Sequence, residues 1–391
     1  MTEKTQLLYD RDAYLDRFTA HVADCRKDEK GDHYHVILDR TCFFPEQGGQ
    51  TADTGRLGEN VRVLDAQIRD GVVDHLTDGP LRPGETVEGR IDFAHRFSHM
   101  QQHTGEHIFS GLVYRDYGFH NVGFHLSERT VTMDYDGFLT VEQTRSLEQM
   151  ANQVIWRDLP VLVTWPEPEE LALIPYRSKK EIAGRLRLVT IPGVDICACC
   201  APHVRRTGEI GVLRVMSAIR YKGGTRLSIL CGKRALDQAV LESGTLSTLG
   251  RMLSCPTEDL ALQVQALMDR EKSLSAALEE TRLSALMKQA EQAACGRRNP
   301  VLTAGPVSEK TACAAADALL MRHPGVCGVL WEEQGKKRVI LVSNSVSLRQ
   351  AAQALRGTGS FKGGGDDACI RGQTEWSADQ LEQWLDAYTK G

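Results

Sequence analysis

Two pairs of metal-binding residue types, far apart in the sequence, place the tightest constraint on how this chain folds. The first pair is His103 and His107 in His-Thr-Gly-Glu-His, and the second is Cys199 and His203 in Cys-Ala-Cys-Cys-Ala-Pro-His. Residues four apart share one face of a helix, so both imidazoles of the first pair can reach a single ion. One thiolate and three imidazoles form a tetrahedral set that suits Zn²⁺. The sequence therefore predicts one Zn²⁺ per chain and a fold that brings the two pairs together.

Two points about this site stay open at the level of sequence. Cys197 and Cys200 compete with Cys199 for the thiolate position. Four protein ligands normally close a zinc site, whereas a catalytic site keeps one position open, so a purely structural ion is the alternative. The 11 cysteines are odd in number and mostly scattered, which disfavours a disulfide framework and favours metal chemistry in a reducing compartment.

Hydrophobic patterning predicts an α+β multidomain chain. Residues 1–92 alternate in short runs between turn dipeptides such as Asp70-Gly71 and Pro83-Gly84, which is typical of a small β-barrel. Helical spacing begins at Phe93 and returns from Val141 to about Arg157, with an alternating strand over 129–135. Residues 93–243 are thus predicted to form an α+β domain that contains the zinc site.

A long helix and a further domain are predicted for the rest of the chain. Residues 244–297 form a helical linker, in which positions 260, 264, 267, 271, 274, 278, 281 and 285 follow a 3-4 spacing. Glu271 and Thr281 weaken this seam as a coiled coil, so a homodimer through this helix stays open. Residues 298–391 read as a C-terminal α/β domain, with helices over 310–322, 348–356 and 381–388 and strands over 326–331 and 338–342.

A glycine motif lies in the predicted barrel. Gly48 and Gly49 precede Gln50 and Thr51 within Phe43–Gly55. Consecutive glycines let a backbone approach a ligand closely, and the following side chains add polar reach. A tight β-turn with incidental polar neighbours is the alternative.

The chain is slightly acidic on average but contains one strongly basic stretch. A net charge of −5 excludes a globally basic nucleic-acid binder. Residues 201–234, however, carry eight Lys and Arg against one acid, and begin next to the predicted metal ligands. Such a patch suits an enzyme acting on the end of a nucleic acid, and a solvated strand face is the alternative. The predicted RNA contacts are Arg205, Arg206, Arg220, Lys222 and Arg226.

The start of the chain and its apolar runs predict a cytoplasmic protein without membrane contact. The first residues lack a basic start followed by an apolar core, and no run reaches the roughly 20 apolar residues that a membrane span needs.

In their order, these motifs resemble the free-standing alanyl-tRNA editing proteins, which are related to the editing and C-terminal domains of alanyl-tRNA synthetase. The resemblance rests on Gly-Gly-Gln-x-x-Asp-x-Gly over 48–55, the two ligand pairs, Lys222-Gly-Gly-Thr-Arg226 and Cys231-Gly-Lys-Arg-Ala235. It covers essentially the whole chain and corresponds to the long form, whose C-terminal domain is similar to the DHH-associated domain.

This resemblance implies a function and a set of site residues. It places zinc ligands on His103, His107, Cys199 and His203, and the family's glycine motif on Gly48, Gly49, Gln50 and Asp53. It implies hydrolysis of the ester in seryl-tRNA wrongly charged on the alanine tRNA, with glycyl-tRNA as an open second substrate. Gly363, Gly364 and Gly365 match the family's terminal glycine run and imply a contact with tRNA, although Asp366 and Asp367 depart from the usual continuation.

The physical logic of editing agrees with this implication. A synthetase pocket for alanine excludes serine poorly, so a second site must reject the wrong product. That site should hydrogen-bond the serine hydroxyl, because an unpaired buried partner would penalise alanine by roughly 1–3 kcal/mol. Gln50, Thr51 and Thr41 are the candidates for this partner. Zinc could position the substrate or activate water, and no general base is identified.

Three alternative functions compete with this interpretation. The segment 103–107 also fits His-x-x-Glu-His, in which Glu106 would be the base of a metallopeptidase. A non-catalytic RNA-binding protein with a structural zinc is the second alternative. The third, phosphoesterase chemistry in the terminal domain, lacks support, because His323 is the only histidine in residues 298–391.

Overall fold

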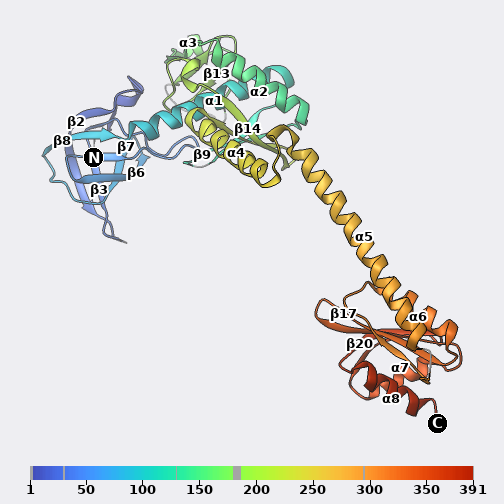
Figure 1. Ribbon diagram of the computed structural model, residues 1–391. Coiled ribbons are helices and arrows are strands. Elements are labelled where there is room, and N and C mark those ends of the chain that lie inside the picture. Colours follow the sequence, from blue (N-terminus) through green and yellow to red (C-terminus); the bar gives the residue numbers. More distant parts are fainter. Residues whose placement is uncertain (1–2, 30, 129, 179–185, 294–295, 391) are drawn as a thin grey trace. The chain divides into compact units, whose positions relative to one another are not determined.

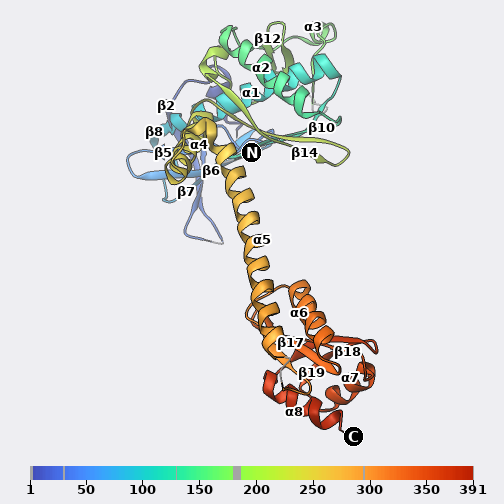
Figure 2. The same cartoon turned by 45° about the vertical axis from the view of Figure 1, so that its right-hand side comes forward.

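The computed structural model describes residues 3–29, 31–128, 130–178, 186–293 and 296–390. The chain forms two compact units, Met1–Leu246 and Ser247–Gly391, and each unit has apolar clusters of its own. Figures 1 and 2 show helices and strands in both units, so the predicted mixed α+β multidomain character is confirmed. Among the described helices, none combines the length and the apolar character that crossing a membrane requires.

Six strands close a barrel at the start of the first unit, as predicted (Figure 1). Alternation along the first of them turns Phe18, Ala20 and Val22 into the barrel core. The strand order around the barrel is β2 (Arg17–Lys27), β3 (Tyr34–Leu38), β7 (Val72–Thr77), β6 (Val61–Arg69), β5 (Gly55–Leu57) and β8 (Thr86–Ile91). Beside it lie β1 (Gln6–Leu7), which pairs in parallel with β4 (Arg40–Thr41), and the short 3-10 helix η1 (Leu8–Asp10).

Helix α1 (Phe93–Tyr117) is the central element of the first unit and begins where the sequence predicts. The Asp92 carboxylate caps its first turn by accepting a hydrogen bond from the His95 N–H, and Gly118 ends it in the left-handed conformation. All residues from 99 to 113 are buried, so the helix is covered on every side. Gly111 permits this covering, because a Cβ there would lie 2.5 Å from the Val194 carbonyl oxygen.

Two antiparallel sheets and a second helix surround α1. The predicted helix from Val141 is present, with Thr140 and Gln143 forming a capping box. The predicted strand over 129–135 begins at Val131 in the structure, and residue 129 lies outside the described residues.

The two sheets differ in their number of strands and in strand order. The first sheet has the order β14 (Leu213–Tyr221), β15 (Gly224–Cys231), β10 (Val131–Tyr135) and β9 (Asn121–Leu126); the second has β11 (Leu162–Thr164), β12 (Leu188–Ile191) and β13 (Asp195–Ala198). The helices are α2 (Val141–Trp156), α3 (Pro168–Leu171), the 3-10 helix η2 (Thr207–Ile210) and α4 (Gly232–Leu253).

The second unit is a five-stranded sheet with helices against both faces. Its order is β16 (Val301–Thr303), β17 (Val326–Glu333), β18 (Lys336–Ser343), β20 (Cys369–Thr374) and β19 (Phe361–Gly365). One apolar cluster joins this sheet to α5 (Leu260–Ala293) and α6 (Glu309–Arg322), and another joins it to α7 (Leu348–Gly357) and α8 (Ala378–Tyr388). The long helix starts at Leu260, after a 3-10 turn η3 (Thr257–Asp259) where the sequence pattern places its start.

The terminal glycine run belongs to an edge hairpin that the sequence pattern did not identify. Gly363 and Gly365 lie in β19, opposite β20. A Cβ at these positions would lie 2.1 Å and 2.0 Å from the carbonyl oxygens of Arg371 and Cys369. Close approach of two strands therefore explains these glycines without a ligand.

A buried ion pair joins α1 to the barrel. The Arg96 guanidinium donates from Nε and Nη2 to the Asp53 carboxylate, and neither side chain is more than 1% exposed. Arg96 also donates to the carbonyl oxygens of Ala13 and Cys42, while Asp53 accepts the Phe44 N–H. Asp53, the acid of the glycine motif, thus has a structural role in docking the helix.

Replacing Asp53 by Asn should destabilise the first unit by about 3–5 kcal/mol, because the Arg96 charge would stay buried without its partner. Urea denaturation followed by fluorescence measures the free energy of unfolding. Asp78→Asn is the matched control, since Asp78 pairs with Arg62 on the exposed outside of the same barrel and should cost no more than about 1 kcal/mol. Equal losses in the two variants would contradict the assigned role of Asp53.

Candidate metal centre

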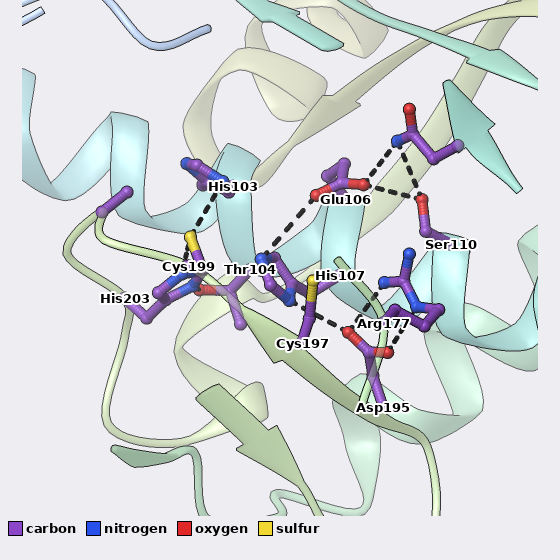
Figure 3. A network of polar contacts seen from close by, with 12 residues as sticks. His103, Thr104, Glu106, His107, Ser110, Arg177, Asp195, Cys197, Cys199 and His203 are labelled. Carbon is purple, nitrogen blue, oxygen red and sulfur yellow. Dashed lines mark hydrogen bonds and ion pairs between the residues drawn. The ribbon is translucent and has the colours of Figure 1, made fainter. Parts of the chain in front are cut away.

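The four predicted ligands converge at one point of the first unit (Figure 3). His103 and His107 come from α1, and Cys199 and His203 come from the segment that follows β13. One ligand atom of each lies within 4.8 Å of the others, and the Cys199 Sγ atom is 3.6 Å from His103 Nε2 and 3.4 Å from His203 Nε2. Tetrahedral zinc with Zn–S of about 2.3 Å and Zn–N of about 2.0–2.1 Å requires S···N separations of about 3.6 Å. The donor set and its spacing therefore fit such an ion.

Each histidine is oriented by a hydrogen bond at its other ring nitrogen. His103 Nδ1 lies 2.8 Å from Gln50 Oε1, and His107 Nδ1 lies 3.0 Å from Asp195 Oδ2. His203 Nδ1 lies 3.0 Å from Thr104 Oγ1. These partners leave all three Nε2 atoms for the ion, as is usual for histidines that bind a metal.

Cys199 differs from the two neighbouring thiols in its electrostatic surroundings. Burial raises the pKa of Cys199, but the facing imidazoles of His103 and His203 outweigh it and bring that pKa well below its ordinary value. Burial raises the pKa of Cys197 to about 11 and that of Cys200 to about 12. The position of Cys199 among the three histidines and the direction of its pKa both favour it over Cys200 and Cys197, and its role as the metal ligand stays a prediction.

The histidine pKa values follow their surroundings. Burial lowers the pKa of His203 to about 3, which keeps its imidazole neutral and able to bind a metal. For His107, burial lowers the pKa, but Cys197, Asp195 and Cys199 outweigh it and raise the value.

Sequence reasoning missed the residues behind His107. Arg177 donates from Nε and Nη2 to the two carboxylate oxygens of Asp195, at 2.7 and 2.8 Å (Figure 3). Asp195 and Cys197 are two residues apart in β13, and a strand places such positions on one face, so Asp195 could have been found by this alternation. Nothing in the sequence points to Arg177.

Glu106 lies beside the centre in a polar network that reaches His107 (Figure 3). Its Oε1 atom accepts hydrogen bonds from Ser110 Oγ and Asn121 Nδ2, at 2.7 and 2.6 Å, and Oε2 lies 3.8 Å from His107 Nε2. Ser110 Oγ in turn lies 2.8 Å from the Tyr135 hydroxyl. The carboxylate is therefore anchored in the protein interior.

The glycine motif contacts both the metal centre and the neighbouring sheet. Gly49 has a φ of +85°, and a Cβ there would lie 2.4 Å from the Phe124 carbonyl oxygen, so its close approach is to β9. This docking carries Gln50 to His103. The Gln50 Nε2 group is buried and has no hydrogen-bond partner among the described residues, and the same holds for Nδ1 of His99, whose Nε2 lies 3.4 Å from Thr51 Oγ1.

The remaining predicted residues lie elsewhere. Thr41 is buried, with its Oγ1 atom 2.9 Å from His75 Nε2 and accepting the Phe43 N–H. Three of the predicted RNA-contacting arginines form ion pairs: Arg205 with Asp12, Arg206 with Asp158 and Arg226 with Asp134. The others stack on aromatic rings, Arg220 over Phe138 and Lys222 over Tyr221. Gly363, Gly364 and Gly365 belong to the second unit.

Comparisons with known proteins match the segment that contains the glycine motif and the segment that contains Cys199 and His203. Residues 3–95 match the tRNA synthetases class II (A), and residues 186–228 match the threonyl and alanyl tRNA synthetase second additional domain. The chain is 32% identical to the alanyl-tRNA editing protein Aarsd1 of Mus musculus over 283 residues, 68% of each chain. It is 28% identical to the alanyl-tRNA editing protein AlaX-L of Pyrococcus horikoshii over 395 residues, 96% of each. It is also 31% identical to the alanine–tRNA ligase of Ignicoccus hospitalis over 290 residues, 71% of this chain and 32% of the ligase.

The closed barrel and the second additional domain are both shared with tRNA synthetases, so the fold places the chain among synthetase-related proteins. The chain belongs to the alanyl-tRNA editing proteins, a family of deacylating hydrolases, and is therefore an enzyme.

Replacing Asp195 by Asn should weaken metal binding about 10–100-fold, because His107 would lose the carboxylate that orients its ring. Competition for Zn²⁺ with a chromogenic chelator measures the affinity. Asp136→Asn is the matched control, because Asp136 contacts Nδ1 of the exposed His120 in the same way. An unchanged affinity in Asp195→Asn would show that this contact does not support the site.

Proposed function

We propose that this enzyme edits in trans, hydrolysing the ester of seryl-tRNA wrongly charged on the alanine tRNA. The observation that carries the proposal is the position of Gln50, whose amide contacts a metal ligand with its oxygen and keeps a buried nitrogen without a partner among the described residues. Family membership supports a tRNA substrate. The buried amide supports a substrate with a small polar group.

We infer that the ion is Zn²⁺, one per chain, because one thiolate and three imidazoles at these spacings suit it. When bound, it would hold the substrate end or polarise the ester. Gln50 orients His103, Asp195 orients His107 and Thr104 orients His203, so the protein presents a rigid ligand set.

Gln50 supplies a physical basis for choosing serine over alanine. His103 engages Oε1, so the amide orientation is set and Nε2 can donate a hydrogen bond to a serine hydroxyl. Alanine and glycine carry no hydroxyl and would leave this buried donor unpaired, at a cost of about 1–3 kcal/mol. A preference of roughly 5–150-fold for seryl-tRNA follows. Thr51 and Thr41 remain further candidates for the same contact.

A structural ion is the second candidate role for this site, because four protein ligands close a tetrahedron. Under that alternative, loss of one ligand unfolds the protein. Under the editing proposal, it yields a folded protein that no longer hydrolyses the ester.

Three proteins should separate these outcomes: the wild type, His103→Ala and Gln50→Ala. The wild type should release serine from the alanine tRNA much faster than alanine. His103→Ala should keep its far-UV circular dichroism spectrum and lose release of both, while Gln50→Ala should lose mainly the preference for serine. Rates come from release of the radiolabelled amino acid, and equal wild-type rates on both charged tRNAs would defeat the editing proposal.

We further propose that two copies of the chain pair through α5. Within the second unit, Val264, Leu267, Leu274 and Leu278 are 45–60% exposed along one seam, whereas Leu286 and Ala290 are buried. Such a seam is what a helix pair would cover.

Leu274→Lys should convert the dimer into a monomer, because it places a charge in the proposed helix contact. Sedimentation equilibrium measures the mass. Leu262→Lys is the matched control, since Leu262 is exposed to a similar degree on α5 but lies off the seam. A monomeric wild type would contradict the proposed pairing.

A further inference from the structure

Four arginines stand side by side across four neighbouring strands of the barrel. In the strand register Arg17 of β2 is opposite Arg90 of β8, Arg90 is opposite Arg56 of β5, and Arg56 is opposite Arg62 of β6. These four residues, Arg17, Arg90, Arg56 and Arg62, form the arginine row. They are far apart in the sequence, so no stretch of the chain is conspicuously basic because of them.

All members of the arginine row point to the outside of the barrel. Residues directly opposite each other on antiparallel strands share a face of the sheet. The next residues along these strands, among them Phe18, Leu57 and Ile91, are buried in the barrel core. Alternation therefore turns the arginines outward, and all four are exposed.

Arg62 is the one member of the arginine row with an ion pair among the described residues. Arg62 pairs with Asp78 at 2.6 Å, and Arg56 donates from Nη1 to the Glu59 carbonyl oxygen at 3.3 Å. Within the described residues, Arg17 and Arg90 have no ion pair. Like charges directly opposite each other destabilise a strand pair, so folding gains nothing from this arrangement. A bound anion would remove the repulsion.

A groove of about 670 Å³ adjoins the arginine row. Arg56, Arg62 and Arg90 line it together with Asp16 and Asp92. The Asp92 carboxylate is engaged in capping α1, where it accepts the His95 N–H. The guanidinium group is planar and bidentate, which suits phosphate oxygens better than any other side chain.

The groove lies at a distance from the metal centre that a short stretch of RNA can span. It includes Thr54 and Gly55, which follow Gln50 closely in sequence, and Ala94, nine residues before His103 on α1. At a helical rise of about 1.5 Å per residue, Ala94 at the edge of the groove lies about 14 Å from His103 along α1. At about 3.4 Å per stacked nucleotide, roughly four nucleotides cover that distance.

We propose that the arginine row binds the phosphate backbone of the tRNA substrate. The identity of this RNA rests on the proposed function. The row is distinct from the basic stretch 201–234, where five of eight cations form ion pairs with Asp12, Asp158, Glu242, Asp134 and Asp237. Because these cations are already paired with acids, fewer positive charges of that stretch are available to bind RNA than its composition indicates.

The test compares two triple variants of the full chain. One removes three charges from the arginine row, Arg17→Gln, Arg56→Gln and Arg90→Gln. The matched control removes three exposed charges from elsewhere on the same barrel, Arg26→Gln, Arg69→Gln and Arg82→Gln. Affinity for uncharged alanine tRNA is measured by filter binding at several KCl concentrations.

The row variant should bind at least about tenfold more weakly at low salt. Its slope of log K against log salt should be shallower by about 2–3, because each phosphate contact contributes roughly 0.7–0.9. The control variant should keep the wild-type slope. Its melting temperature should equal that of the wild type, and that of the row variant should be equal or higher, because repulsion between opposite strands is relieved.

An unchanged slope in the row variant would overturn the proposal, as would an equal loss in the control, which would show an effect of net charge alone. If the triple variant fails to fold, Arg90→Gln alone should lower the slope by about 0.7–0.9. Binding to uncharged tRNA does not depend on hydrolysis. A wild type that binds through the row but leaves seryl-tRNA intact would refute the proposed function, whereas an active wild type with an unaffected row variant would refute this inference.

Discussion

The buried ion pair between Arg96 and Asp53 is the contact on which the rest of the first unit depends. It lies two helical turns before His103 on α1, and its carboxylate lies three residues after Gln50 in the glycine motif. One interaction therefore sets the distance between the helix that carries two metal ligands and the loop that orients one of them. Because both groups are fully buried and fully hydrogen-bonded, only one arrangement of helix and barrel satisfies them.

The hydrogen-bond partners that orient the three histidines of the metal centre come from three different elements. Gln50 comes from the barrel, Asp195 from β13 and Thr104 from α1 itself. Gly49 and Gly111 let β9 and the start of β13 approach closely enough for these contacts. The geometry of the ion site is thus a property of the whole unit, and the same Gln50 amide that orients His103 presents the buried donor with which we explain selection of serine.

The cations that are available to bind RNA cannot be identified from composition alone. The stretch 201–234 is strongly basic in sequence, yet five of its eight cations form ion pairs with acids outside the stretch. The arginine row is invisible in sequence, since its members are spread from residue 17 to residue 90, and strand register alone places them side by side. The proposed RNA-binding surface is assembled by pairing of strands, a long-range event that no local pattern reports.

The sequence by itself predicted the barrel, the helices from Phe93 and Val141, and the cluster of His103, His107, Cys199 and His203, because these depend on local periodicity and on a spacing of four residues. It left open which cysteine is the thiolate, and it missed Arg177, Asp195 and the hairpin of β19 and β20. These points depend on the tertiary structure, because the pKa of a thiol depends on burial and facing charges, and a hydrogen-bond partner depends on which distant segment packs there. Local sequence patterns specify helices, strands and the types of metal-binding residues. Long-range packing supplies the burial, the facing charges and the hydrogen-bond partners on which the site depends.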